Sequence, residues 1–266
     1  MGLSFGPKIR VEGGSFSHNG QMGIAGTGGE GSRIEGVEIA FNNYAGYNSG
    51  WQAGGTKFWA TTGLIVRNTC VHHNEGKGLW TDFDNIGTIY EGNVVFSNAN
   101  DGIKHEISYD AVIRDNIVAA NGYGYDNWLW GSQILVQNSS NVEVHGNLVE
   151  VSGEFGNGIS IVHQDRGEGA YGPWHAVRNA VHDNTIVHLG RHGQNGIATD
   201  EDDNSFWKES DNKFDRNTYI VVDQEVGQWT SINRDAVWKD VGDLGLEGNG
   251  ELIVQQRAPM ELSCDR

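Results

Sequence analysis

The sequence has little proline, little cysteine and few cations, with 3 Pro, 2 Cys and 18 Lys plus Arg among 266 residues. Cys70 and Cys264 lie too far apart to give a disulfide framework or a metal-binding spacing, so we expect two unpaired thiols. The 18 cations oppose 35 Asp plus Glu, and the net charge is −17. Because such a surface repels phosphate, nucleic acid and anionic membranes are excluded as partners.

Long apolar runs and a leader segment are also missing. No stretch of 18 or more apolar residues occurs, which argues against a membrane-spanning segment. The segment from Met1 to Pro7 has neither a charged start nor an apolar core, so it is not a signal peptide. We nevertheless expect an extracellular, secreted protein, whose signal peptide is not part of this chain.

Glycine, in contrast, is abundant. The chain contains 39 Gly without a G-X-Y period, which excludes collagen and disfavours long helices. It also contains 9 Trp, 8 Tyr and 9 Phe, which argues against disorder. This composition favours a globular protein with many turns.

An eleven-residue block recurs along the chain. Leu64 to Asn74, Thr88 to Asn98 and Ala111 to Asn121 share apolar pairs in the same columns, and their final Asn recurs after 24 and then 23 residues. Ile9 to Asn19 and Arg33 to Asn43 fit the same template. Alternating apolar residues indicate strands, and a period of this length predicts a stacked repeat protein.

Two further regularities mark each repeat. In several blocks the final Asn is followed by three residues and then by Gly and an apolar residue, as in Gly78-Leu79 and Gly102-Ile103. The sixth column is almost entirely asparagine: Thr69, Asn93, Asn116, Asn147, Asn184, Asn217. Stacked side-chain amides can hydrogen-bond from one coil to the next, so this column predicts a solenoid of short parallel strands.

These motifs resemble the right-handed parallel β-helix superfamily of pectate lyases, glycoside hydrolases and uronate epimerases. The resemblance covers roughly residues 9–222 and implies an all-β fold. We expect about eight coils in residues 1–222, and a short C-terminal cap or extension in residues 223–266. The N-terminal end has no obvious cap, so the protein is expected to be a monomer or a homo-oligomer formed through that end.

Outward-facing positions of the strand after each Gly predict a site. Counting from the Gly, the fourth position reads Trp59, Asp82, Glu106, Leu135, Val162, Asp200, and the second reads Lys57, Trp80, Lys104, Gln133, Ser160, Ala198. Neighbouring coils lie about 4.8 Å apart, so the Asp82 and Glu106 carboxyl groups should lie roughly 5 Å apart. Two close carboxylates resist joint ionisation, so one pKa should rise and that group can act as an acid.

Further residues complete the predicted substrate site. Trp59 and Trp80 should offer ring faces to sugars, and Lys57 and Lys104 should offer charge. His105 should point inward. The remaining predicted contacts are Asp84 (the main rival of Asp82), Trp130 in a ring-rich insertion, Ser160, His163 and Asp200. No cofactor is required, although the acidic run from Asp200 to Asn204 offers oxygens that suit Ca²⁺.

The segments around Asp82 and Glu106 also resemble the β-helix β-xylosidase family. That family places an Asp nucleophile and a Glu acid/base one coil apart, but it carries a β-sandwich insertion for which this chain has no room. The resemblance implies a retaining glycoside hydrolase acting on a polysaccharide or oligosaccharide. A polysaccharide lyase or epimerase acting on uronates, with a Lys or Arg base, and a non-catalytic sugar-binding or structural module remain alternatives.

Overall fold

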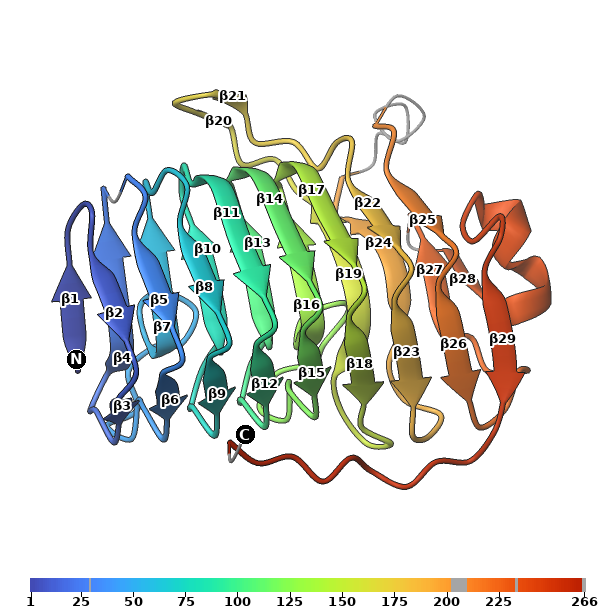
Figure 1. Ribbon diagram of the computed structural model, residues 1–266. Helices are drawn as coiled ribbons and strands as arrows, with labels where there is room; N and C mark the ends of the chain where they lie inside the picture. Colours follow the sequence, from blue (N-terminus) through green and yellow to red (C-terminus); the bar gives the residue numbers. More distant parts are fainter. Residues whose placement is uncertain (29, 202–209, 233, 265–266) are drawn as a thin grey trace.

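The computed structural model describes residues 1–28, 30–201, 210–232 and 234–264. Its strands form three parallel sheets, here called A, B and C, wrapped around one apolar core (Figure 1). Each of the first eight coils contributes one short strand to each sheet and then rises to the next coil. The predicted all-β parallel β-helix is therefore confirmed.

The strands are assigned to the sheets as follows. Sheet A contains β1 (Leu3–Phe5), β4 (Met22–Thr27), β7 (Gly54–Trp59), β10 (Leu79–Asp82), β13 (Ile103–Glu106), β16 (Ser132–Gln137), β19 (Asn157–His163), β24 (Asn195–Thr199), β27 (Trp229–Ser231) and the antiparallel β28 (Arg234–Ala236). Sheet B contains β2 (Arg10–Glu12), β5 (Arg33–Glu35), β8 (Ile65–Arg67), β11 (Ile86–Glu91), β14 (Tyr109–Arg114), β17 (Ser140–His145), β22 (Ala180–His182) and β25 (Lys213–Asp215). Sheet C contains β3 (Ser15–Ser17), β6 (Glu38–Ala40), β9 (Cys70–His72), β12 (Val94–Phe96), β15 (Ile117–Ala119), β18 (Leu148–Val151), β23 (Thr185–His188), β26 (Thr218–Val221) and β29 (Glu251–Val254).

The coils reach further toward the C-terminus than predicted, and two additional segments pack against them or project from them. The eight described strands of sheet B correspond to the eight predicted coils. Sheets A and C continue past residue 222 through β27 and β29, so the coils extend further than the expected boundary. A 3₁₀ helix, η1 (Trp238–Leu244), packs against this end, and a small hairpin of β20 (Glu168–Gly169) and β21 (Gly172–Pro173) projects from one edge.

A ladder of buried side chains joins the coils between sheets B and C. Each asparagine amide donates to the Oδ1 of the next one: Asn93 to Asn116, Asn116 to Asn147, Asn147 to Asn184 and Asn184 to Asn217, all at 2.9 Å. Each Oδ1 also accepts the backbone N–H of the preceding ladder residue. The predicted amide column is confirmed, and it satisfies the buried polar groups of every turn.

A second ladder lies between sheets C and A. It runs through Asn19, Asn42, Asn74, Asn98, Asn121 and Gln133, again through amide-to-Oδ1 or Oε1 bonds. The second block therefore ends on Asn42, not on Asn43 as expected. This ladder also explains the recurring glycine, because a Cβ on Gly78 would lie 2.9 Å from the amide nitrogen of Asn98. Only glycine leaves room for the stacked amides at this point.

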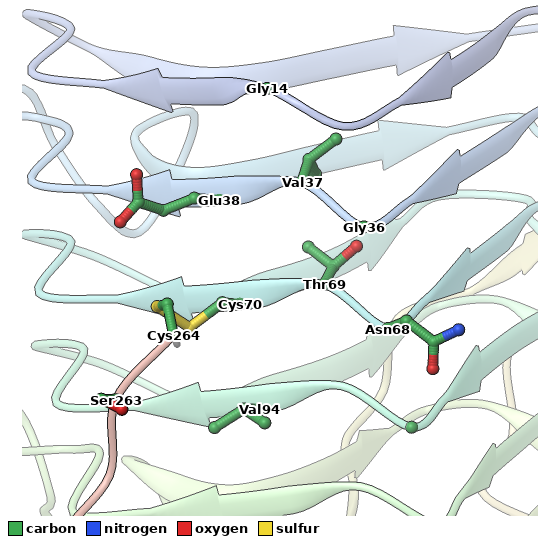
Figure 2. Close-up of a pocket in the computed structure, with 11 residues that line it drawn as sticks. Gly14, Gly36, Val37, Glu38, Asn68, Thr69, Cys70, Val94, Ser263 and Cys264 are labelled. Carbon is green, nitrogen blue, oxygen red and sulfur yellow. A yellow bond between two sulfur atoms is a disulfide. The ribbon is translucent and has the colours of Figure 1, made fainter. Parts of the chain in front are cut away.

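The expectation of two unpaired thiols is wrong. Cys70 and Cys264 form a disulfide, because the last described residues (255–264, the C-terminal strap) run back along sheet C to β9 (Figures 1 and 2). Met260 and Leu262 of the strap pack against the cluster that contains Phe96, and the Met260 N–H donates to Glu150 Oε2 at 3.0 Å. The repeat pattern does not encode the path of this strap, so sequence spacing alone could not reveal the pairing.

Removing one asparagine from the ladder between sheets B and C should destabilise the solenoid strongly. We expect Asn116→Ala to lower the free energy of unfolding by about 3 kcal/mol or more, because Asn93 then loses the acceptor of two buried donors. Chemical denaturation measures the change. The exposed Asn127→Ala variant is the control, and an equal loss in both variants would contradict the role of the ladder.

The disulfide should stabilise the fold by closing a very long loop. We expect Cys264→Ser to lower the free energy of unfolding by about 2–5 kcal/mol. Thermal unfolding with and without a thiol reductant measures this effect. The reductant should lower the Tm of the parent protein and of the Ser263→Ala control, but not that of Cys264→Ser. A reductant-insensitive parent protein would argue against the bond.

Candidate functional site

The predicted site lies on the outward face of sheet A. Asp82 of β10 pairs in register with Glu106 of β13, and Trp80 pairs with Lys104, as the repeat predicted. Strand alternation directs these four side chains away from the core, whereas the intervening His105 points inward. His105 is fully buried, and its Nδ1 lies 2.7 Å from the Thr81 hydroxyl.

Both carboxylates are paired with cations. Lys57 Nζ lies 2.7 Å from Asp82 Oδ2, and Lys104 Nζ lies 2.9 Å from Glu106 Oε2. Arg166, from the loop before β20, reaches Glu106 Oε1 at 3.2 Å. Glu106 is therefore a buried anion held by two cations, and it is not the free acid that the register alone suggested.

Trp80 lies beneath a group of three lysines, here called the lysine cluster: Lys57, Lys77 and Lys104. Their ammonium groups lie 4.0, 4.2 and 5.8 Å from the centre of the Trp80 ring. The ring is buried and donates its Nε1–H to Glu106 Oε2 at 3.0 Å. The expectation that Trp80 offers an exposed face to sugars is therefore wrong, because cations already occupy that face.

An insertion covers the lysine cluster. Residues 43–52, the first insertion, place the Trp51 carbonyl 2.5 Å from Lys57 Nζ and the Ser49 carbonyl 2.9 Å from Lys77 Nζ. All three lysines are less than a tenth exposed. Sequence reasoning missed Lys77, although its position immediately before the Gly78-Leu79 motif places it two residues before β10, where it pairs with Gly54 of β7.

The charges shift the pKa values in opposite directions. Burial alone would raise the pKa of Glu106, but the charges of Lys104 and Lys77 more than offset it and hold the pKa at about 2. Burial and the Glu106 charge raise the pKa of Asp82, despite Lys57. Burial and the charge of Lys104 lower the pKa of Lys77 to about 8. One carboxyl pKa does rise, as predicted, but it belongs to Asp82 and not to the expected acid Glu106.

The predicted column breaks after Glu106. Gln137, and not Leu135, lies opposite Glu106, because the insertion before β16 returns to the sheet two residues later than expected. Leu135 lies opposite Lys104 and packs in an apolar cluster with Leu129 and Val162. Ala198 follows Val162, so Asp200 is outside the column.

The remaining predicted contacts are spread over the face. Trp59 is partly exposed at the end of β7, and the centre of the Trp130 ring lies 5.4 Å from Lys104 Nζ. Ser160 and His163 are buried in β19, so neither is a surface contact, and Ser160 accepts a hydrogen bond from Ser132. Asp84 accepts the Trp174 Nε1–H and so anchors the hairpin loop instead of replacing Asp82.

Metal ligands are scarce among the described residues. In the described part of the chain, Cys70, His72 and Cys264 are the only group of three or more such residues whose ligand atoms all lie within 4.8 Å of one another, and the two sulfurs are bonded to each other. Of the acidic run proposed for Ca²⁺, residues 202–204 lie outside the described part of the chain. Asp200 itself accepts a hydrogen bond from Gln164 at 2.6 Å.

Removing the Glu106 charge should expose the repulsion within the cluster. We expect Glu106→Ala to lower the free energy of unfolding by about 3–5 kcal/mol, because buried cations lose their partner. The ionised Glu106 stabilises the fold fully above its ordinary pKa of 4.5, and this contribution is lost as the pH falls toward 2. The free energy of unfolding, measured as a function of pH, should fall as the pH is lowered from 4.5 toward 2 in the parent protein and in the exposed Glu251→Gln control. The Glu106→Gln variant should not show this fall.

No helix among the described residues has the length and apolar character needed to cross a bilayer.

No curated protein matches the sequence. Two solved structures resemble the chain. An alginate lyase from Paenibacillus sp. str. FPU-7 has 10% identity and a TM-score of 0.34, over 90% of this chain and 99% of that one. The Agl-KA catalytic domain has 11% identity and a TM-score of 0.28, over 93% and 63% of the two chains.

At these scores, neither likeness carries an argument about function. The sequence itself is more informative. The family model described as "Right handed beta helix region" matches residues 3–140, which is more than half of the chain. The chain therefore belongs to the right-handed β-helix family.

Proposed function

We propose that this protein is carbohydrate-active and acts on uronate-containing polysaccharides by proton abstraction, as a lyase or an epimerase. The observation that carries the proposal is the lysine cluster with Arg166 on the outward face of sheet A, where four cations outnumber the three carboxylates of Asp82, Glu106 and Asp101. A buried excess of positive charge is costly unless an anion binds there. The carboxylate of a uronate supplies such an anion.

The chemistry of elimination fits these groups. Lys104 and Arg166 neutralise the sugar carboxylate, which makes the neighbouring C5–H more acidic. Lys77 takes the C5 proton, the C4–O4 bond breaks, a C4=C5 double bond forms and the leaving O4 takes up a proton. An epimerase shares only the removal of the C5 proton: the C4–O4 bond stays intact, and a proton returns to C5 from the opposite face. The lowered pKa of Lys77, about 8, supports its use as a base near neutral pH.

A retaining glycoside hydrolase is the second candidate. The in-register pairing of Asp82 and Glu106 favours it, because such enzymes need two carboxyl groups close together. The pKa directions would exchange the expected roles, so that Asp82 is the acid and Glu106 the ionised nucleophile. Ca²⁺ is not needed in either scheme. The Cys70–Cys264 disulfide supports, as a further proposal, an extracellular location.

The experiment is a screen of polygalacturonate, alginate and neutral polysaccharides. We expect ultraviolet absorbance from unsaturated uronates, or exchange of the C5 proton with solvent, only on the acidic polymers. Activity should rise with pH through about 8, as the fraction of neutral Lys77 grows. Reducing ends without absorbance and without C5 exchange would favour the hydrolase instead, and binding without turnover would favour a non-catalytic module.

Variants of Lys77 separate charge from proton transfer. Lys77→Arg keeps the positive charge but cannot act as a base near pH 8, so we expect a loss of at least a hundredfold in kcat. The exposed Lys239→Met variant should retain full activity. Full activity in Lys77→Arg together with inactivity in Asp82→Asn would show that Asp82 and Glu106, and not Lys77, are the catalytic residues.

A further inference from the structure

The first insertion, which covers the lysine cluster, also walls a separate hollow. This hollow, of about 330 Å³, lies between residues of the first insertion and residues around Gly124. Its volume is within the range of small-molecule sites. Ser49 belongs to both places, because it lines the hollow while its carbonyl accepts a hydrogen bond from Lys77.

Two exposed tyrosines stand at this hollow. Tyr44 is 71% exposed and comes from the first insertion, whereas Tyr125 is 48% exposed and comes from the insertion after Asn121. Two rings that come from different insertions and line one hollow are unusual for a surface that binds nothing. Aromatic faces of this kind suit the apolar faces of pyranose rings.

The polar lining suits hydroxyl groups and disfavours acids. Asn100 lines the hollow and uses its Oδ1 to accept the Asp101 N–H, and its amide group is of the kind that donates to sugar hydroxyls. Glu75 binds the Tyr123 hydroxyl through Oε1 and keeps Oε2 as an acceptor. Among the described residues that line the hollow, Glu75 is the only charged one, so a sugar carboxylate would meet repulsion there.

The hollow is held in place by the coils beneath it. The Asn43 amide donates to the Glu75 carbonyl at 2.6 Å, and the Gly124 N–H donates to the Ala99 carbonyl at 2.8 Å. Both insertions are thus tied to the coils that also carry the lysine cluster. This fixes the spacing between the hollow and the cluster, as a binding site for one continuous chain requires.

On the other side of the first insertion lies a second, smaller hollow of about 230 Å³, lined by Gln21, Tyr47, Asn48, Trp51 and Gln52. Trp51 is 74% exposed, and none of these lining residues is charged. The same insertion therefore presents rings and amides on both of its flanks. Both hollows share the chemistry of neutral sugar recognition.

We propose that the hollow between Tyr44 and Tyr125 binds a neutral sugar unit. Resting on the proposed function, the substrate is then a mixed polymer in which uronate and neutral sugar units are neighbours. The uronate would bind at the lysine cluster, and the neutral unit would bind across Ser49. A polymer made of uronates alone would still reach the lysine cluster, but it would bring a carboxylate against Glu75 and so should bind less tightly than a mixed polymer.

Binding without turnover tests this site independently of catalysis. The probes are the β-1,4-linked hexamers of xylose, glucose and mannose, measured by titration calorimetry. We expect at least one of them to bind the parent protein, and Tyr44→Ala/Tyr125→Ala to weaken that binding about tenfold or more, because both ring contacts are lost. Unchanged thermal unfolding of the double variant would show that it folds.

Two controls keep the outcomes distinct. Tyr171→Ala removes a tyrosine that is 54% exposed on the hairpin loop, and Lys104→Met removes a cation of the cluster, and both should keep the neutral hexamer bound. If no uronate is turned over but the tyrosine-dependent binding remains, the proposed function fails and this site stands. No binding of any neutral hexamer, or an equal loss in Tyr171→Ala, would overturn the site.

A third arm tests the mixed polymer. A xylo-oligosaccharide that carries a glucuronic acid branch should bind at least tenfold more tightly than the unbranched oligomer, and Lys104→Met should abolish this gain. Equal affinities for the branched and unbranched oligomers would contradict the neighbouring arrangement of the two units.

Discussion

The stacking of one coil directly on the next is the constraint on which the rest of this structure depends. Parallel strands lie about 4.8 Å apart, and each side chain meets the equivalent side chain of the next coil. The two amide ladders fix that alignment, because Asn116 can bond to Asn93 and Asn147 in only one register. Outward side chains then form columns, and a column can bring carboxylates and cations together without any long loop.

The same regularity explains which features the sequence revealed. Between Thr69 and Asn121 the repeats follow one another without insertions, so counting residues placed Asp82 beside Glu106 correctly. After Asn121 an insertion intervenes, and nothing in the sequence marks where the chain rejoins sheet A. The two-residue error at Leu135 follows directly from this ambiguity, whereas Val162 lies in the column as predicted and the register is lost a second time before β24, which misplaces Asp200.

Side-chain exposure was predicted less well than register, for a related reason. A strand pattern shows that Trp80 points outward, but it does not show that the first insertion folds back over it. The Cys70–Cys264 bond depends in the same way on the strap, whose extended path carries no repeat. In this solenoid, local periodicity determines the coils, whereas the covering segments are positioned by contacts between residues distant in sequence.

The net charge of −17 need not keep acidic sugars away from the site. At physiological ionic strength the Debye length is about 8 Å, so scattered surface acids are largely screened, while partly buried charges are screened much less. Near the lysine cluster the closest charges are cationic, and they already hold Glu106 ionised. A ligand that reaches these lysines must replace the carbonyl groups of Ser49 and Trp51. A carboxylate does so more readily than a hydroxyl group, because charge-assisted hydrogen bonds to ammonium are stronger than neutral ones. In the proposed function, the first insertion therefore favours acidic groups at the lysine cluster, while its outer flanks present aromatic rings to neutral sugar units.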